Sequence, residues 1–213
     1  MIYREQTAAS TAQHLLQINA IKLNPENPFT WASGWKSPIY CDNRLALSYP
    51  EVREYLAREL AKAVEELYPG EVTIAGVATG AIGIGMLVAQ QLRAPFVYVR
   101  PEPKKHGRKN QIEGHVPENQ SIVVIEDLIS TGKSSLNAVK AIEKQGHQIL
   151  GMLALFSYGF KVAEDNFSEA GIALHTLSDY EHLLQFAQAE NAITPDQKTT
   201  LSAWREDPAH WTP

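Results

Sequence analysis

The chain has 213 residues, of which 44% are hydrophobic and 20% charged, a composition typical of a globular protein with one sizeable core. The formal net charge of −5 argues against a general nucleic-acid binder, and no apolar run is long enough to cross a bilayer. Because the N-terminus lacks a signal peptide's apolar core and the single cysteine, Cys41, cannot form an internal disulfide, we expect one domain (1–213) in the cytoplasm.

Helical and strand patterns alternate along the chain. The predicted helices lie at 5–19, about 50–68, about 81–92, 133–145, 160–170 and 178–189, with a last short helix opening at 194–197. The predicted strands lie at 29–31, 37–42, 72–76, 96–99, 121–125, 148–156 and 172–177. This alternation predicts an α/β fold with a central parallel sheet flanked by helices, and ligands at the carboxyl ends of its strands.

Local signals refine these elements. Three helix starts show a capping-box pattern, a hydroxyl residue followed three positions later by Glu or Gln: Ser48 with Glu51, Ser178 with Glu181, and Thr194 with Gln197. The turn Ser33-Gly34 between the first two strands suggests a hairpin. We expect this hairpin to belong to a small hood formed by residues 1–45 and the C-terminal helical segment.

The most informative stretch is 121–135. An apolar, β-branched run at 122–125 predicts a buried strand, and Glu126 and Asp127 follow it. The small turn Ser130-Thr131-Gly132 then opens a helix. Free backbone N–H groups at such a helix start bind anions, and the hydroxyls add donors. The two carboxylates must face something else, such as sugar hydroxyls or a metal ion, so the pattern indicates a phosphorylated sugar as the ligand.

Two other segments complete the candidate site. The loop 77–81 after the strand at 72–76 is either a second anion loop or the start of a helix that packs closely through Gly80, Gly83 and Gly85; these glycines do not have the dinucleotide-binding order. A basic segment follows the strand at 96–99 and contains Arg100, Lys104, Lys105, Arg108 and Lys109. An acidic protein that concentrates cations in one loop is expected to use them on an anionic ligand.

A nucleoside-triphosphatase reading competes for the same stretch. Gly132-Lys133-Ser134 is the end of a Walker A motif, but the motif needs a glycine where this chain has Asp127. A carboxylate at that position would repel a triphosphate, so we reject this reading.

The stretch 121–135 resembles the phosphoribosyl-diphosphate (PRPP) signature of type I phosphoribosyltransferases. The segment from Phe29 to Asp42, with its Ser33-Gly34 and Ser37-Pro38 pairs, resembles the hood motif of orotate phosphoribosyltransferases. The segment from Arg100 to Gly114 resembles their mobile catalytic loop. Three motifs in this order cover most of residues 1–160 and narrow the resemblance to that family.

The resemblance implies a reaction and a set of roles. Orotate and PRPP, with Mg²⁺ carried by PRPP and no confident protein ligand for the metal, would give orotidine 5′-phosphate and pyrophosphate. The implied PRPP-binding residues are Arg100, Lys104, His106, Glu126, Asp127, Leu128, Ile129, Ser130, Thr131, Gly132, Lys133 and Ser134. Of these, Lys104, His106 and Asp127 are the implied catalytic residues, and Ser130, Lys36 and Tyr40 are the implied orotate contacts. The resemblance also implies a homodimer in which the 100–114 loop reaches the neighbouring site, with no nucleic acid or membrane as partner.

The chain departs from some family members at basic or aromatic positions. Ala32, Thr79-Gly80 and Pro101 stand where those members have a lysine, a Tyr-Lys pair and a lysine. Lys36 either supplies one missing charge or is a solvated hairpin lysine. Two alternatives remain beside the leading one: a purine phosphoribosyltransferase, which would not be expected to carry the hood motif, and a PRPP-binding regulator without catalysis, which usually brings a nucleic-acid-binding surface.

Overall fold

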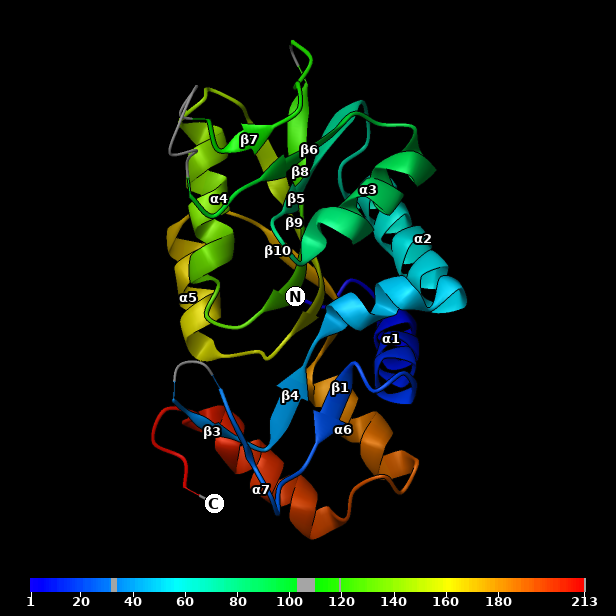
Figure 1. Cartoon of the computed structure of the whole chain (residues 1–213), viewed down its shortest axis with the longest axis vertical. Helices are drawn as coiled ribbons and strands as arrows, with labels where there is room; N and C mark the ends of the chain where they lie inside the picture. Colours follow the sequence, from blue (N-terminus) through cyan, green and yellow to red (C-terminus); the bar gives the residue numbers. More distant parts are fainter. Residues whose placement is uncertain (32–33, 103–109, 119, 213) are drawn as a thin grey trace.

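The computed structural model describes residues 1–31, 34–102, 110–118 and 120–212. Its centre is a six-stranded sheet with the order β10-β9-β8-β5-β6-β7, parallel except for β7 (Figure 1). The strands are β5 (Val72–Val77), β6 (Phe96–Val99), β7 (Ile112–Glu113), β8 (Ser121–Ile129), β9 (Ile149–Ser157) and β10 (Leu174–Asp179). The predicted α/β class with a central parallel sheet is confirmed.

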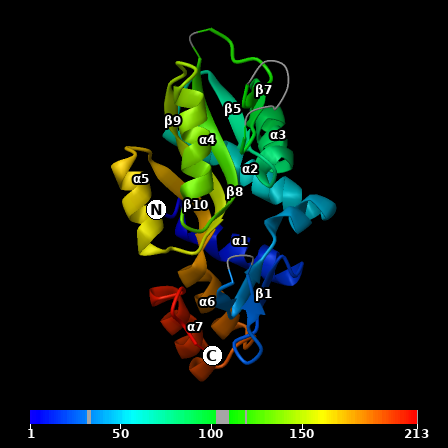
Figure 2. The ribbon, with the colours of Figure 1, turned by 60° about the vertical axis from the view of Figure 1, so that its left-hand side comes forward.

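Helices cover both faces of the sheet. Figures 1 and 2 show α4 (Lys133–Glu143) and α5 (Lys161–Glu169) on one face, and α2 (Pro50–Leu67) and α3 (Ala81–Leu92) on the other. α1 (Glu5–Gln17) packs against β10 and α6. The buried strand β8 explains the two layers, because its alternate side chains enter different cores: Val123 and Ile125 on the α2–α3 side, Ile122 and Val124 on the α4–α5 side.

A small lobe lies at the end of the molecule away from β7 (Figure 1). It contains two antiparallel pairs, β1 with β4 and β2 with β3, beside two helices. The elements are β1 (Ile21–Leu23), β2 (Phe29–Thr30), β3 (Lys36–Ser37), β4 (Ile39–Cys41), α6 (Tyr180–Ala189) and α7 (Pro195–Glu206). The predicted strand at 37–42 is therefore split around Pro38, and β1 was not predicted, because a three-residue strand is too short to show a period.

The C-terminal helix α7 packs against the β2–β3 hairpin of this lobe through Trp204. Trp204 of α7 is fully buried, and its ring meets Trp31 edge-on at 5.5 Å between centroids. Its indole Nε1 also donates to the carbonyl oxygen of Lys36 at 3.2 Å. A large aromatic side chain with a satisfied N–H thus joins the last helix to the early hairpin.

The helix starts test the capping predictions. The box at Thr194 and Gln197 is confirmed, with both reciprocal hydrogen bonds present. The box at Ser48 is wrong, because α2 begins after Tyr49 without a side-chain cap. The box at Ser178 is also wrong: β10 continues through Asp179, and that carboxylate caps α6 by accepting from the His182 N–H. Within the described residues, no helix has the length and apolar character needed to cross a membrane.

Candidate active site

A cavity of about 510 Å³ opens at the carboxyl ends of β5 and β8. Its lining residues come from three segments: Cys41, Asp42 and Arg44 at and after the end of β4, 77–80 from the end of β5, and most of 126–134 from β8 into α4. Of the predicted PRPP residues, those lining it are Glu126, Asp127, Leu128, Ser130, Thr131, Gly132 and Ser134. Because parallel strands bring their carboxyl ends to one edge, segments that are distant in the sequence meet here.

The acidic pair lies within β8. The sequence predicts the strand to end at 125, but it continues to Ile129 because β9 runs beside it, with Ile129 opposite Ser157. Glu126 is only 4% exposed. Its Oε1 accepts from the Asp127 backbone N–H at 3.0 Å, and its Oε2 accepts from the Ser135 hydroxyl at 2.8 Å. Both carboxylate oxygens therefore have a fixed partner inside the fold.

Burial changes the proton affinity of both acids. Burial, and then the neighbouring Asp127 carboxylate, raise the pKa of Glu126 well above its usual range. Burial also raises the pKa of Asp127. The charged form is disfavoured where water is excluded and a like charge is adjacent. These carboxyls therefore keep their protons to higher pH than exposed acids do.

Asp127 is held from two sides. A Cβ added to Gly80 would lie 2.4 Å from the Asp127 carboxyl atoms, so the carboxylate occupies the space that glycine leaves open at the start of α3. On the other side, the side-chain Nδ2 of Asn43 donates to the Asp127 carbonyl oxygen at 2.6 Å. Glycine and asparagine thus set the position of the carboxylate that faces the cavity.

The turn before α4, called the anion cradle below, has a geometry that favours anion binding. Gly132 has φ +75°, and α4 begins at Lys133. A Cβ on Gly132 would meet Phe167 of α5 at 2.7 Å, so both the backbone angle and the space require glycine. Asn166 of α5 donates to the Thr131 carbonyl oxygen at 2.9 Å. With the Ser130, Thr131 and Ser134 side chains beside the start of α4, the turn can bind a phosphate group.

The three glycines that follow β5 have different surroundings. Gly80 lines the cavity, whereas a Cβ on Gly83 would meet Leu47 at 2.7 Å and one on Gly85 would meet Phe96 at 3.1 Å. Gly83 and Gly85 therefore serve close packing of α3, and Gly80 serves the site. The peptide bond between Ala78 and Thr79 is cis.

Other predicted site residues lie away from this cavity's lining. Ile129 is fully buried in the core beside α4 and α5, and Lys133 is exposed at the first turn of α4. Arg100, after β6, lies 3.5 Å from Glu113 of β7. Lys104 and His106 lie outside the described residues.

The two predicted orotate contacts of the small lobe are also absent from that lining. The Lys36 Nζ donates to the Thr30 hydroxyl at 2.9 Å across the β2–β3 hairpin. Tyr40 is 42% exposed, with its ring 5.7 Å from that of Phe29. Both side chains are thus held on the small lobe.

Sequence reasoning missed the wall formed by the small lobe. Cys41, Asp42 and Arg44 line the cavity, and Asn43 braces it. Burial raises the pKa of the Cys41 thiol well above its usual value, so this cysteine is not an activated nucleophile. The sequence did contain a signal for this wall. The polar residues 42–44 come at the end of the predicted strand 37–42, and polar residues at strand ends often line ligand sites.

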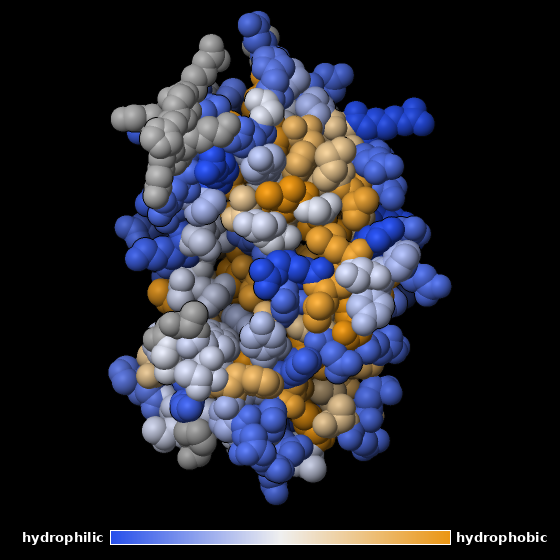
Figure 3. All heavy atoms as spheres, in the orientation of Figure 1, coloured by the Kyte–Doolittle hydropathy of each residue, from blue (hydrophilic) through white to orange (hydrophobic). Residues whose placement is uncertain are grey.

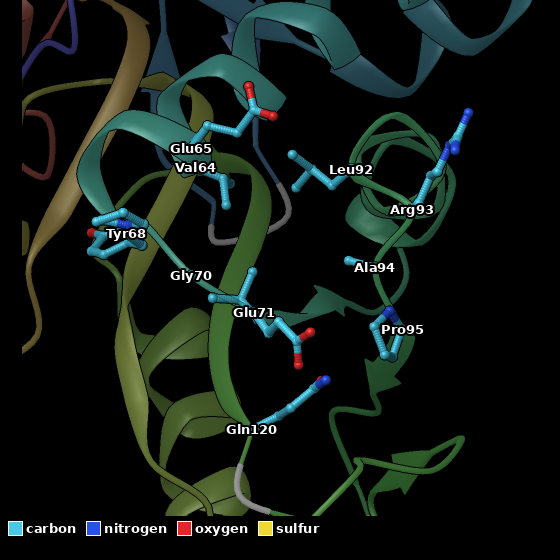
Figure 4. A pocket seen from close by; sticks show the side chains of 12 residues that line it. Val64, Glu65, Tyr68, Gly70, Glu71, Leu92, Arg93, Ala94, Pro95 and Gln120 are labelled. Atoms are coloured by element: carbon cyan, nitrogen blue, oxygen red, sulfur yellow. The ribbon is translucent and has the colours of Figure 1, made fainter.

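A second cavity, of about 500 Å³, lies at the opposite ends of β5 and β6 (Figure 4). Val64, Glu65 and Tyr68 stand on one side of it, and Leu92 and Arg93 on the other. Among its described lining residues there is no turn of small hydroxyl residues and no acidic pair on a strand end. The first cavity therefore carries the site chemistry. Across the described part of the chain, no cluster of three or more His, Cys, Asp or Glu residues has metal-binding geometry.

Comparisons with known proteins show the family of this chain. Residues 49–173 match the family model described as a phosphoribosyl transferase domain. The orotate phosphoribosyltransferase of Cytophaga hutchinsonii is 52% identical over 211 residues, 99% of either chain, and that of Phocaeicola vulgatus is 54% identical over 200 residues, 94% of either chain. The crystal structure of orotate phosphoribosyltransferase from Aeropyrum pernix superposes with a TM-score of 0.73 at 26% identity, covering 82% of this chain and 96% of that one. The chain belongs to the orotate phosphoribosyltransferase family.

Proposed function

We propose that this protein transfers the ribose 5-phosphate of PRPP to orotate, giving orotidine 5′-phosphate and pyrophosphate in pyrimidine synthesis. The observation that carries the proposal is the continuity of two binding elements in one cavity. The acidic pair on β8 runs directly into the anion cradle at the start of α4. A sugar phosphate presents hydroxyls and a phosphate on one molecule. The family membership supplies the identity of the acceptor.

Each end of PRPP has a proposed partner. The 5′-phosphate binds the turn from Ser130 to Ser134, where hydroxyls and backbone N–H groups meet the positive end of α4. The ribose 2′- and 3′-hydroxyls bind Asp127 and Glu126. Leu128 lines the cavity between these groups, whereas buried Ile129 and exposed Lys133 contribute backbone contacts at most.

Catalysis has to stabilise the charges that develop on the ribose and on the leaving group. Displacement at the ribose C1 builds positive charge on the sugar and negative charge on the departing diphosphate. The carboxylate of Asp127 stands near the first charge, and Arg100, Lys104 and His106 neutralise the second. Arg100 follows β6, whose carboxyl end lies at the same edge of the sheet as the acids. Closure of the 100–114 loop would also exclude water from the activated sugar.

Magnesium enters this proposal with the substrate. The cavity presents carboxylate and hydroxyl oxygens, the ligand type that Mg²⁺ prefers. The donor set thus fits an ion carried by PRPP, whose ribose hydroxyls Glu126 and Asp127 hold. A bound ion would supply charge neutralisation on the diphosphate.

Orotate is proposed to bind between the cradle and the small lobe. Ser130 lies on the cavity wall, and Lys36 and Tyr40 stand on the adjacent β3 and β4. Their side chains lie outside the lining of the cavity, so their contact with orotate requires the small lobe to approach the bound base.

A homodimer is part of the proposal. Figure 3 shows apolar side chains gathered over α3, and Leu45, Tyr49 and Met86 are among the exposed large hydrophobic residues. A contiguous apolar face of this kind suits burial against a second copy. The 100–114 loop would then reach the neighbouring site. We place the protein in the cytoplasm, where its single cysteine would remain reduced.

The test is loss of the ultraviolet absorbance of orotate in the presence of PRPP and Mg²⁺. We expect a loss that needs both. If orotate is not consumed but a purine base is, the alternative purine phosphoribosyltransferase is correct. If no base is consumed while PRPP binds by calorimetry, the protein is a PRPP-binding regulator.

A further inference from the structure

The described lining of the cavity contains one cationic side chain, that of Arg44. Arg44 is the only Lys or Arg among the described lining residues, which also include three acids, Asp42, Glu126 and Asp127. The facing segment, Ala78 to Gly80, brings no charged side chain. PRPP carries anionic groups at both ends, so the arginine on this wall could bind one of them.

Arg44 is already oriented. Its Nε lies 2.6 Å from Asp42 Oδ1 and its Nη2 lies 2.9 Å from Asp42 Oδ2, a two-point pair that fixes the guanidinium plane. The Asp42 Oδ1 also accepts from the Arg44 backbone N–H at 3.3 Å, so the carboxylate caps the 3-10 helix η1 (Asn43–Ser48). The hydrogen bond from Arg44 in turn lowers the pKa of Asp42, which keeps the pair ionised.

The pair leaves part of the arginine free. A guanidinium has five N–H donors, and Asp42 engages one on Nε and one on Nη2. The remaining donors lie on the edge away from Asp42. The Arg44 side chain is 58% exposed, so this edge is open to a ligand. A fork of this kind matches phosphate oxygens in geometry and charge.

The position of Arg44 indicates which anion it meets. The cradle for the 5′-phosphate lies at the α4 end of the site, where Asn166 and Phe167 of α5 support it. Arg44 belongs to the opposite wall: its neighbour Asn43 bonds to Asp127, and Asp127 lies against Gly80. A ribose held by the acids separates these two ends, so its C1 substituent points to the wall of Arg44 and Gly80.

We infer that Arg44 binds the diphosphate of PRPP, with Asp42 holding its guanidinium in place. The inference rests on the proposed function for the ligand, PRPP, and for the orientation of its ribose. It adds a cation from the small lobe to those of the 100–114 loop, and this cation is in place without loop closure. Arg44 therefore contributes to capture of PRPP as well as to charge neutralisation on the departing pyrophosphate.

The experiment compares Arg44→Gln with wild type by calorimetry in Mg²⁺ buffer, using PRPP, inorganic pyrophosphate and ribose 5-phosphate as probes. Loss of a charged hydrogen-bond donor should weaken PRPP and pyrophosphate by about 10- to 100-fold. Ribose 5-phosphate, which lacks the diphosphate, should bind unchanged. Arg44→Lys keeps the charge but loses the forked donor geometry, so its affinity for PRPP and pyrophosphate should lie between those of wild type and Arg44→Gln.

Arg4 offers a matched control. It is 53% exposed and lies 2.6 and 2.7 Å from the two carboxylate oxygens of Glu66, in a pair outside this cavity. Arg4→Gln should leave all three affinities unchanged. The thermal unfolding midpoint of Arg44→Gln should stay near that of wild type, because exposed ion pairs add little stability.

The outcomes separate the two proposals. Unchanged pyrophosphate affinity in Arg44→Gln overturns the inference, as does a loss confined to the KM for orotate, which would place Arg44 on the base. If wild type binds PRPP and Arg44→Gln does not, but orotate is never consumed, the inference stands and the proposed function fails. If wild type binds neither PRPP nor pyrophosphate, both fail.

Discussion

The side-chain amide of Asn43 and the backbone carbonyl of Asp127 are joined by a 2.6 Å hydrogen bond. The two residues are 84 positions apart in the sequence. Asn43 is 2% exposed and follows β4 of the small lobe, whereas Asp127 lies near the end of β8. The bond therefore ties the small lobe to the strand that carries the acidic pair, at the point where the ribose is proposed to bind.

Changing Asn43 should disturb ribose binding. In Asn43→Asp the shape is kept, but an oxygen replaces the Nδ2 donor and faces the Asp127 carbonyl oxygen. The buried bond is lost and repulsion replaces it, so PRPP affinity measured by calorimetry should fall about tenfold. The exposed Asn27→Asp is the control and should bind PRPP as wild type does. Equal affinity in the two variants would show that the tie does not position Asp127.

Gly80 and Gly83 form a matched pair on one helix start. An added methyl group at Gly80 meets the Asp127 carboxyl at 2.4 Å, whereas one at Gly83 meets the end of the Leu47 side chain at 2.7 Å. Gly80→Ala should displace the carboxylate and weaken PRPP binding about tenfold or more. Gly83→Ala should change the unfolding midpoint but not the affinity. If both variants bind PRPP equally well, the Asp127 carboxylate can relocate without cost to the site.

The buried carboxyl of Glu126 should make stability depend on pH. Its pKa in the folded protein is raised, chiefly by burial and then by Asp127. A carboxyl of this kind favours folding while it is protonated, and the contribution is lost as pH rises from the usual carboxyl range through the raised pKa. Glu126→Gln stays neutral and can still accept from the Asp127 N–H.

The measurement for Glu126 is the thermal unfolding midpoint between about pH 5 and pH 8. Relative to Glu126→Gln, wild type should lose stability as pH rises across this window. Parallel pH profiles for the two proteins would mean that Glu126 ionises in the folded state as easily as in the unfolded chain.

His182 should also make the folded protein less stable as pH rises. It bridges Glu5 of α1 and Asp179 of β10, at 2.7 and 2.8 Å. Burial lowers the pKa of His182, but the hydrogen bonds that its ring donates to the carboxylates of Glu5 and Asp179 outweigh this and raise it overall. The protonated form is therefore favoured in the folded state. Its stabilisation is full below the ordinary histidine pKa and is lost as pH rises through the raised value.

His182→Gln should thus lower the unfolding midpoint more at about pH 5.5 than at about pH 8.5. His210→Gln is the control, because His210 is highly exposed and contacts a single carboxylate, Asp207, at 2.9 Å. That variant should match wild type at both values. A His182→Gln deficit that is equal at both pH values would indicate lost packing instead of a lost charge interaction.

Much of the fold could be predicted because its signals are local. The β-branched run at 122–125 predicts a buried strand wherever it is placed, and the box at Thr194 and Gln197 satisfies its helix start through bonds within four residues. The capping boxes expected at Ser48 and Ser178 are absent, and for Ser178 the reason is a tertiary contact. The Ser178 hydroxyl is buried and donates to the carbonyl oxygen of Ala8 on α1.

The sequence by itself determined the parallel sheet, the acidic pair and the anion cradle, because strand period, glycine turns and helix starts depend on neighbouring residues. Only the tertiary structure decided how long β8 is, since pairing with β9 extends it past the acids. It also decided that Asn43 bonds to Asp127, that Arg44 lines the cavity and that Gly80 makes room for Asp127. Those relationships join residues that are far apart in the chain, and a contact of that kind leaves no periodic signal in the sequence.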